Sequence, residues 1–132
     1  MSDTINVESV KGKVDFAVIT IRPDEYKAVL DRVTNRKVVI QGRCHYEYGT
    51  IETVNKEPVN IAIARPASQG HGAAQQLANN MIHDLEPKWF VLVGIAGAFP
   101  NDDFSLGDVV FATKSRLAPS CNPKSKHRWH HW

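Results

Sequence analysis

The sequence predicts an α/β protein with a mixed, largely parallel central sheet flanked by helices. Two nearly continuous apolar runs, Val14–Ile21 and Trp89–Ala98, are typical of strands buried on both faces of a parallel sheet. Between them, a segment that opens at Gly70–Gly72 and ends at Pro87 carries apolar residues at helical spacing. Because parallel strands are joined by crossovers that usually contain a helix, this strand–helix–strand order indicates a parallel α/β sheet.

A second helix is predicted directly after the first strand. Pro23 favours the first helical position, and Asp24 and Glu25 place negative charge against the positive end of the helix dipole. Four apolar residues then follow at helical spacing, namely Tyr26, Val29, Leu30 and Val33. The segment therefore predicts a strand-to-helix unit.

The other predicted strands are short and separated by glycines or polar loops. Residues that favour strands occupy Val38–Gln41, Cys44–Val54 and Val59–Ala64, which we interpret as two or three strands of one meander. After the polar loop Pro100–Ser105, the β-branched run Gly107–Thr113 predicts one more strand.

We expect three segments in the chain. Residues 1–13 form an N-terminal extension, residues 14–115 the partial α/β domain, and residues 116–132 a basic tail rich in His and Trp. The tail has neither helical nor strand periodicity, so it is expected to be disordered or to arise from an out-of-frame sequence.

The distribution of charge argues against a nucleic-acid-binding domain. Residues 1–115 hold 12 Lys or Arg and 14 Asp or Glu, and residues 116–132 hold four basic residues and no acid. The positive excess is thus confined to the tail, and a nucleic-acid arm there is the weakest alternative. The two cysteines, Cys44 and Cys121, have no CxxC spacing, so we expect free thiols and no structural metal site.

The sequence predicts a cytoplasmic protein. Its N-terminus carries acids where a secretory signal would have a basic and an apolar region. The longest apolar run, Trp89–Phe99, is too short to span a bilayer.

Candidate binding residues lie where predicted strands end, because ligands of parallel sheets collect at the carboxyl ends of the strands. Asp24 and Glu25 follow the first strand, and a carboxylate there can orient a water or a sugar hydroxyl; two acids that stabilise a helix start are the alternative. The Gly94–Gly97 turn lets the backbone approach a ligand, or it is only a structural turn.

The third candidate is the start of the long helix. Gly70 permits a tight turn, and the first helical N–H groups can face an anion. His71 is either a proton donor or simply a solvated loop histidine.

Four segments in this order resemble the phosphorylase superfamily, which includes purine nucleoside phosphorylases and methylthioadenosine/S-adenosylhomocysteine nucleosidases. The residues that carry the resemblance are Val14–Val29, Ser68–Ala74, Pro87–Ala98 and Leu106–Ala112. It covers about residues 14–115 and corresponds to the N-terminal half of that fold.

The resemblance implies cleavage of purine nucleosides at the N-ribosyl bond, with no cofactor. It assigns Glu25 to positioning the attacking water, with Asp24 as the fallback. The backbone of Gly94, Ile95, Ala96 and Gly97 would line the nucleoside pocket. Phosphorylases have an arginine and a serine where this chain has Leu92 and Ile95, so the resemblance favours hydrolysis over phosphorolysis.

Two functional pairs that the resemblance implies are missing from this sequence. A Met-Glu pair would bind the ribose hydroxyls and a Ser-Asp pair would protonate the leaving purine, yet the only Ser-Asp is Ser2-Asp3. We therefore expect a truncated, inactive enzyme domain that forms homo-oligomers or associates with a full-length relative. The alternative is a non-catalytic module that pairs with such a relative and regulates it.

Overall fold

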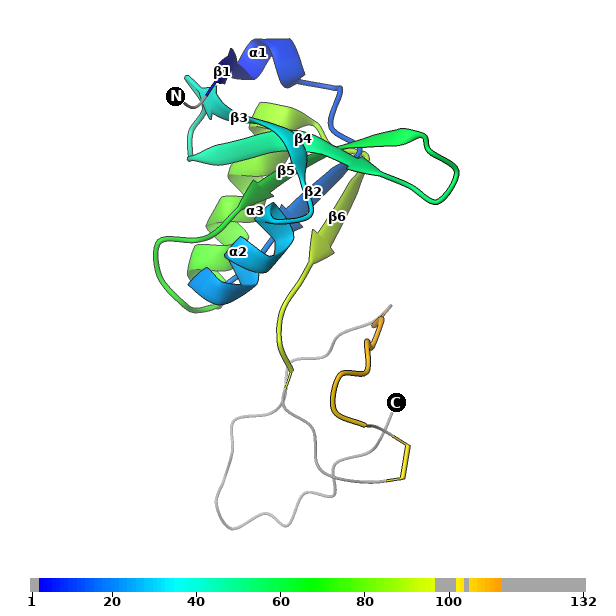
Figure 1. Ribbon diagram of the computed structural model, residues 1–132. Coiled ribbons are helices and arrows are strands. Elements are labelled where there is room, and N and C mark those ends of the chain that lie inside the picture. The colour runs from blue at the N-terminus through cyan, green and yellow to red at the C-terminus, as the bar shows by residue number, and fades with distance from the viewer. Residues whose placement is uncertain (1–2, 97–101, 104, 113–132) are drawn as a thin grey trace. The chain divides into compact units, whose positions relative to one another are not determined.

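The computed structural model describes residues 3–96, 102–103 and 105–112. The chain divides into two units, Met1–Ala96 and Gly97–Trp132. The helices and strands of the described residues belong to the first unit (Figure 1). In chain order they are β1 (Thr4–Asn6), α1 (Val7–Val10), β2 (Phe16–Ile19), α2 (Pro23–Leu30), β3 (Thr34–Ile40), β4 (Tyr46–Glu52), β5 (Pro58–Ala64), α3 (His71–Leu85) and β6 (Trp89–Leu92).

A six-stranded mixed sheet with strand order β1-β3-β4-β5-β2-β6 forms the centre of this unit. β2 pairs in parallel with both β5 and β6, and β1 pairs in parallel with β3. β3, β4 and β5 are antiparallel neighbours, so the predicted meander is confirmed with three strands. The predicted α/β class with a mixed, largely parallel sheet and flanking helices is also confirmed.

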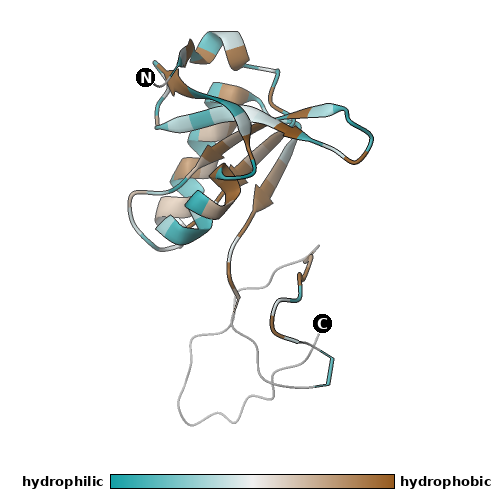
Figure 2. Ribbon diagram, viewed as in Figure 1, coloured by the Kyte–Doolittle hydropathy of each residue, from teal (hydrophilic) through white to brown (hydrophobic). Residues whose placement is uncertain are grey.

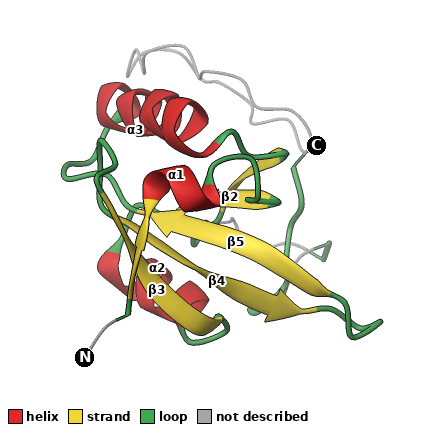
Figure 3. Cartoon of the chain, turned by 90° about the horizontal axis from the view of Figure 1, so that it is seen from above, coloured by secondary structure: helices red, strands yellow, loops and turns green. Residues whose placement is uncertain are grey.

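Helices cover both faces of the sheet, with α1 and α3 on one face and α2 on the other (Figure 3). The alternation of strand side chains produces this arrangement. Ala17 and Ile19 of β2 pack in the cluster that includes Met81 and Leu85 of α3. Val18 lies in the opposite cluster, against α2. Figure 2 shows the apolar character of β2 and of its neighbour β6.

Both predicted helices form, but α2 ends at Leu30, so Val33 lies beyond the helix in which it was expected and packs in the core cluster on the α2 face instead. Pro23 is the first residue of α2, and Arg22 is its N-cap in an extended conformation. α3 ends at Leu85, where Glu86 adopts the left-handed conformation with φ +47° and donates its N–H to Ile82 O at 3.1 Å. Pro87 follows, and proline cannot continue the helical hydrogen-bond pattern.

Residues 4–10, part of the expected N-terminal extension, contribute to the sheet and the core. β1 adds a parallel strand to β3, and Val7 and Val10 of α1 are buried. The Asn6 side chain accepts the Glu8 N–H at 2.9 Å and caps α1. Three residues of strand and four of helix are too short for sequence periodicity to reveal.

The expectation that Trp89–Ala98 forms a strand buried on both faces is wrong. The strand ends at Leu92 and lies at the edge of the sheet, and the side chains of Trp89 and Leu92 are 65% and 71% exposed. The composition of an apolar run shows that a strand could be buried. Whether it is buried depends on the elements that pack beside it. Among the described residues of the first unit, no strand pairs with the outer edge of β6.

The strand predicted over Gly107–Thr113 is also not present in the described part, residues 107–112. Residues 105–108 form a turn instead, in which the Ser105 N–H donates to Asp108 Oδ2 at 2.8 Å and the Asp108 N–H donates to Ser105 O at 3.1 Å. Val109 is 94% exposed. A β-branched run becomes a strand only where a partner strand accepts its backbone hydrogen bonds, and no strand is assigned to these described residues.

Candidate functional site

The carboxylate of Glu25 joins the β2–α2 turn to the loop that follows β6. Its Oε2 accepts the N–H groups of Ile21 at 3.1 Å and Arg22 at 2.9 Å. Its Oε1 accepts the N–H of Ile95 at 2.9 Å, and the residue is only 7% exposed. β2 and β6 are parallel neighbours, with Ile19 opposite Leu92, so the segments after their carboxyl ends meet at one edge of the sheet.

The position of Glu25 follows from the way α2 starts. Glu25 is the third residue of the helix, and a glutamate there can bond back to the N–H of the N-cap residue, as it does with Arg22. Glu25 therefore stabilises the start of α2, and this role is compatible with a role in binding a ligand. A carboxylate has about four acceptor directions. Backbone N–H groups occupy three of them.

The loop after β6 contains the other candidate residues of this site. Gly94, Ile95 and Ala96 have no regular secondary structure, and the Ile95 side chain is 70% exposed. Gly97 lies outside the described residues. The Ile95 N–H donates the hydrogen bond that joins this loop to Glu25, across a separation of 70 residues in sequence.

Asp24, the fallback for Glu25, makes its hydrogen bonds with its sequence neighbours at the start of α2. Its carboxylate forms an exposed ion pair with Arg22, with Nη2 and Oδ2 2.9 Å apart, and its Oδ1 accepts the Glu25 N–H at 3.0 Å. The Asp24 and Arg22 side chains are 52% and 57% exposed. Among the described residues of the loop after β6, the hydrogen bond from Ile95 goes to Glu25 and not to Asp24.

Thr20, the residue after β2, adds a second polar group at this end of the strand. Its side chain is fully buried, and among the described residues its Oγ1 has no hydrogen-bond partner. Buried hydroxyls normally have a partner, so Thr20 is a polar group that sequence reasoning missed. No periodicity distinguishes it, because it continues the apolar run of β2.

Gly70 is the N-cap of α3, as expected of the third candidate segment. Its φ of +128° is accessible to glycine, and no side chain caps this helix start. His71 is the first residue of the helix. No hydrogen bond among the described residues joins Gly70 to Glu25 or to the loop after β6.

The backbone donors around Glu25 hold the pKa of its carboxyl below the ordinary value of 4.5; the Arg22 N–H has the largest effect and the Ile95 N–H the next. Burial and the neighbouring Asp24 charge oppose this lowering of the pKa. A lowered pKa means that the charged form stabilises the fold at neutral pH. That contribution is lost as the pH falls through the folded-state pKa.

We expect this loss to be visible in the pH dependence of unfolding. The stability difference between the wild type and Glu25→Gln should be constant above about pH 6 and should shrink as the pH falls below about 4. Thermal unfolding of both proteins between pH 7 and pH 3 measures it. A difference that does not change with pH would show that the Glu25 charge does not contribute.

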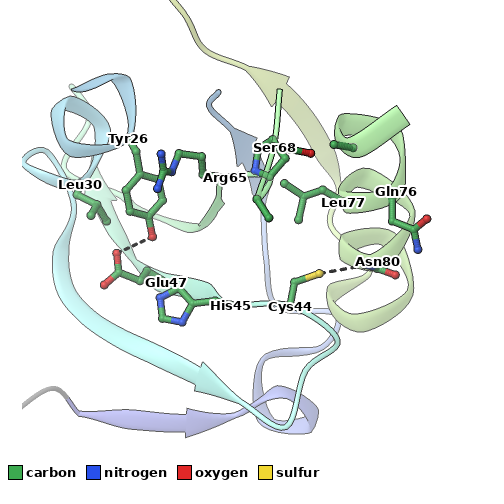
Figure 4. A pocket seen from close by; sticks show the side chains of 13 residues that line it. Tyr26, Leu30, Cys44, His45, Glu47, Arg65, Ser68, Gln76, Leu77 and Asn80 are labelled. Atoms are coloured by element: carbon green, nitrogen blue, oxygen red, sulfur yellow. Dashed lines mark hydrogen bonds between the residues drawn. The ribbon is translucent and has the colours of Figure 1, made fainter. Parts of the chain in front are cut away.

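A cavity of about 710 Å³ lies apart from Glu25, between α2, α3 and the segment after β5 (Figure 4). Its lining includes Tyr26, Glu47 and Arg65 on one side and Cys44 and Asn80 on the other. Neither Glu25 nor residues 93–96, the described start of the loop after β6, line it. Its volume is in the range of small-molecule sites, so it competes with the Glu25 junction as a place for a ligand.

Two side-chain hydrogen bonds shape this cavity. Tyr26 Oη donates to Glu47 Oε2 at 2.9 Å, and Asn80 Nδ2 donates to Cys44 Sγ at 3.1 Å (Figure 4). Burial and the Glu47 carboxylate raise the pKa of Tyr26, so its hydroxyl stays protonated. Each bond joins residues far apart in sequence, which explains why local patterns did not reveal the cavity.

No helix within the described ranges is long and apolar enough to cross a membrane. In the same part of the chain, no three His, Cys, Asp or Glu side chains gather closely enough to hold a metal ion.

Comparison with known families agrees with the fold and with the resemblance noted in the sequence. The model of the phosphorylase superfamily matches residues 15–126, which is most of the 132-residue chain. A comparison with the curated proteins gives no match. The matched range includes β2, Glu25, β6 and the loop that carries Ile95. On this match, the chain belongs to the phosphorylase superfamily.

Proposed function

We propose that this chain is a purine-nucleoside-binding domain of the N-ribosyl-cleaving type. One observation carries the proposal, namely the 2.9 Å hydrogen bond between the Ile95 N–H and Glu25 Oε1. The family resemblance implies the water side of a site for Glu25 and the nucleoside side for the Ile95 loop, and the bond joins them across 70 residues of sequence. Membership of the phosphorylase superfamily supports a nucleoside as the ligand.

Glu25 is suited to the water-side role in this chemistry. Cleavage of an N-ribosyl bond passes through an oxocarbenium-like state, which a nearby carboxylate stabilises while it orients a nucleophile. Because backbone donors lower its pKa, Glu25 is ionised at neutral pH and can accept a hydrogen bond from water. Among the described residues, one acceptor direction of its Oε1 is left without a donor, and this oxygen lies beside the backbone of the loop after β6.

We further propose that water, and not phosphate, is the nucleophile. The two positions that carry an arginine and a serine in phosphorylases are Leu92 and Ile95 here, and neither side chain can bind an anion. The resemblance also implies Ser-Asp and Met-Glu pairs that these 132 residues do not supply. We therefore propose that binding of a nucleoside is stronger than its turnover, which is slow or absent for this chain by itself.

The test is to incubate the purified chain with adenosine, inosine and methylthioadenosine, with and without phosphate, and to measure free base and bound nucleoside. Saturable binding, with base release that is slow and independent of phosphate, supports the proposal. Release that requires phosphate would overturn the hydrolytic part. The absence of binding for all three nucleosides would overturn the proposal as a whole.

The exposed edge of β6 favours a second candidate, a non-catalytic module that pairs with another copy or with a full-length relative. Trp89 and Leu92 are 65% and 71% exposed, and the strand Trp89–Leu92 contains no charged residue. Charged side chains are a common device by which edge strands avoid pairing, and β6 has none.

We expect Leu92→Lys to abolish such pairing, because a charge on the edge opposes the addition of an apolar strand. Val54→Lys is the matched control, since Val54 is fully exposed in the connection between β4 and β5. Light scattering, together with co-purification of a full-length relative, measures the association. Equal association of both variants would exclude the β6 edge as the interface.

A further inference from the structure

The backbone of the loop after β6 packs directly against the Glu25 carboxylate. A Cβ atom added to Gly94 would lie 3.3 Å from Glu25 Oε1 and 3.7 Å from both Cδ and Oε2. Gly94 is not among the glycines with positive φ, so its backbone conformation is open to other residues. A side chain at this position would therefore press on the Glu25 carboxylate, and one of the two would have to give way by a few tenths of an ångström.

The hydrogen bonds of Glu25 leave little freedom for its carboxylate. Oε2 accepts two backbone N–H groups, from Ile21 and Arg22, and Oε1 accepts one, from Ile95. Rotation of the carboxylate would weaken all three bonds together. The remaining acceptor direction of Oε1 is therefore fixed in space by the β2–α2 turn on one side and by the loop after β6 on the other.

We infer that Gly94 and the Ile95 amide are positioning groups for Glu25, which hold its Oε1 so that a single acceptor direction is left for a water. The role in water binding rests on the proposed function; the positioning itself does not. The Ile95 N–H orients the oxygen, and the absence of a side chain at Gly94 lets the oxygen come within reach of that N–H.

The test compares Gly94→Ala with Gly72→Ala. Gly72 lies in α3, has no positive φ, and a Cβ there would meet nothing within 4 Å, so the same chemical change is made in open space. In Gly94→Ala the contact has to open by a few tenths of an ångström. We expect this shift to lengthen the bond between Glu25 Oε1 and the Ile95 N–H. Two properties are measured by NMR, namely the titration midpoint of the Glu25 carboxyl carbon and the hydrogen exchange of the Ile95 amide.

We expect Gly94→Ala to raise the titration midpoint of Glu25, because a donor that favours its charged form is weakened. The Ile95 amide should exchange about threefold to tenfold faster. Gly72→Ala should change neither property. A merely structural role of Gly94 in the loop would not alter the Glu25 titration, so unchanged titration and exchange in Gly94→Ala would overturn the inference.

A second variant keeps the inference testable if Gly94→Ala does not fold. Glu25→Asp shortens the side chain by one methylene, so the carboxylate can no longer reach the β2–α2 turn and Ile95 together. Faster exchange of the Ile95 amide in this variant supports the inference, and unchanged exchange contradicts it. If the NMR changes occur but the wild type does not bind adenosine, the positioning stands and the proposed function fails.

Discussion

Where the wild-type chain shows slow nucleoside cleavage, replacement of Glu25 by Gln is expected to lower its rate by about 10²- to 10⁴-fold, the range usual for a lost acid–base group. An amide cannot carry the negative charge that orients a water and stabilises an oxocarbenium-like state. The side-chain NH₂ group of Gln would also face one of the backbone N–H groups from which the carboxylate accepts a hydrogen bond, and two donors cannot bond each other. The measurement is the release of free purine over long incubations, detected by chromatography.

Asp24→Asn distinguishes the two acids. Asp24 is exposed and paired with Arg22, so this variant should lower cleavage much less than Glu25→Gln does. If Asp24→Asn lowered the cleavage rate more than Glu25→Gln does, Asp24 and not Glu25 would be the acid that orients the water. Thermal unfolding of both variants checks that lost activity does not reflect lost structure.

The second large effect concerns the packing of α3 on the sheet. Met81 is fully buried in the cluster shared by α3, α1 and the central strands, so Met81→Ala leaves a cavity there. We expect it to lower the free energy of unfolding by about 2–5 kcal/mol. Ile82→Ala is the matched control, because the adjacent Ile82 is 52% exposed. Denaturant unfolding measures both variants, and equal losses would contradict the packing described for α3.

Sequence patterns were sufficient for most of the individual elements. The β-branched run that contains β2, the proline and acids that start α2 and the apolar stripe of α3 each depend on contacts within a few residues or on a simple periodicity. The antiparallel meander followed from the strand runs that glycines separate. The neighbours of each element were harder to predict, because pairing depends on residues that are distant in sequence.

Two elements show this limit clearly. β6 has the composition of a buried central strand, yet it lies at the sheet edge with Trp89 and Leu92 exposed. The cavity between α2 and α3 depends on Tyr26 meeting Glu47, which is 21 residues away, and no local pattern encodes that contact. Glu25 was predicted from its place after a strand, whereas its bond to the Ile95 backbone could not be read from side-chain types.

We propose that a purine nucleoside binds where Glu25 meets the loop after β6. The most direct measurement is an NMR titration of the chain with adenosine, following the backbone amides. We expect the largest shifts at Ile21, Arg22, Ile95 and Ala96, which surround the Glu25 carboxylate. Shifts concentrated instead at the cavity residues, such as Arg65 or Asn80, or no shifts at saturating adenosine, would contradict binding at Glu25.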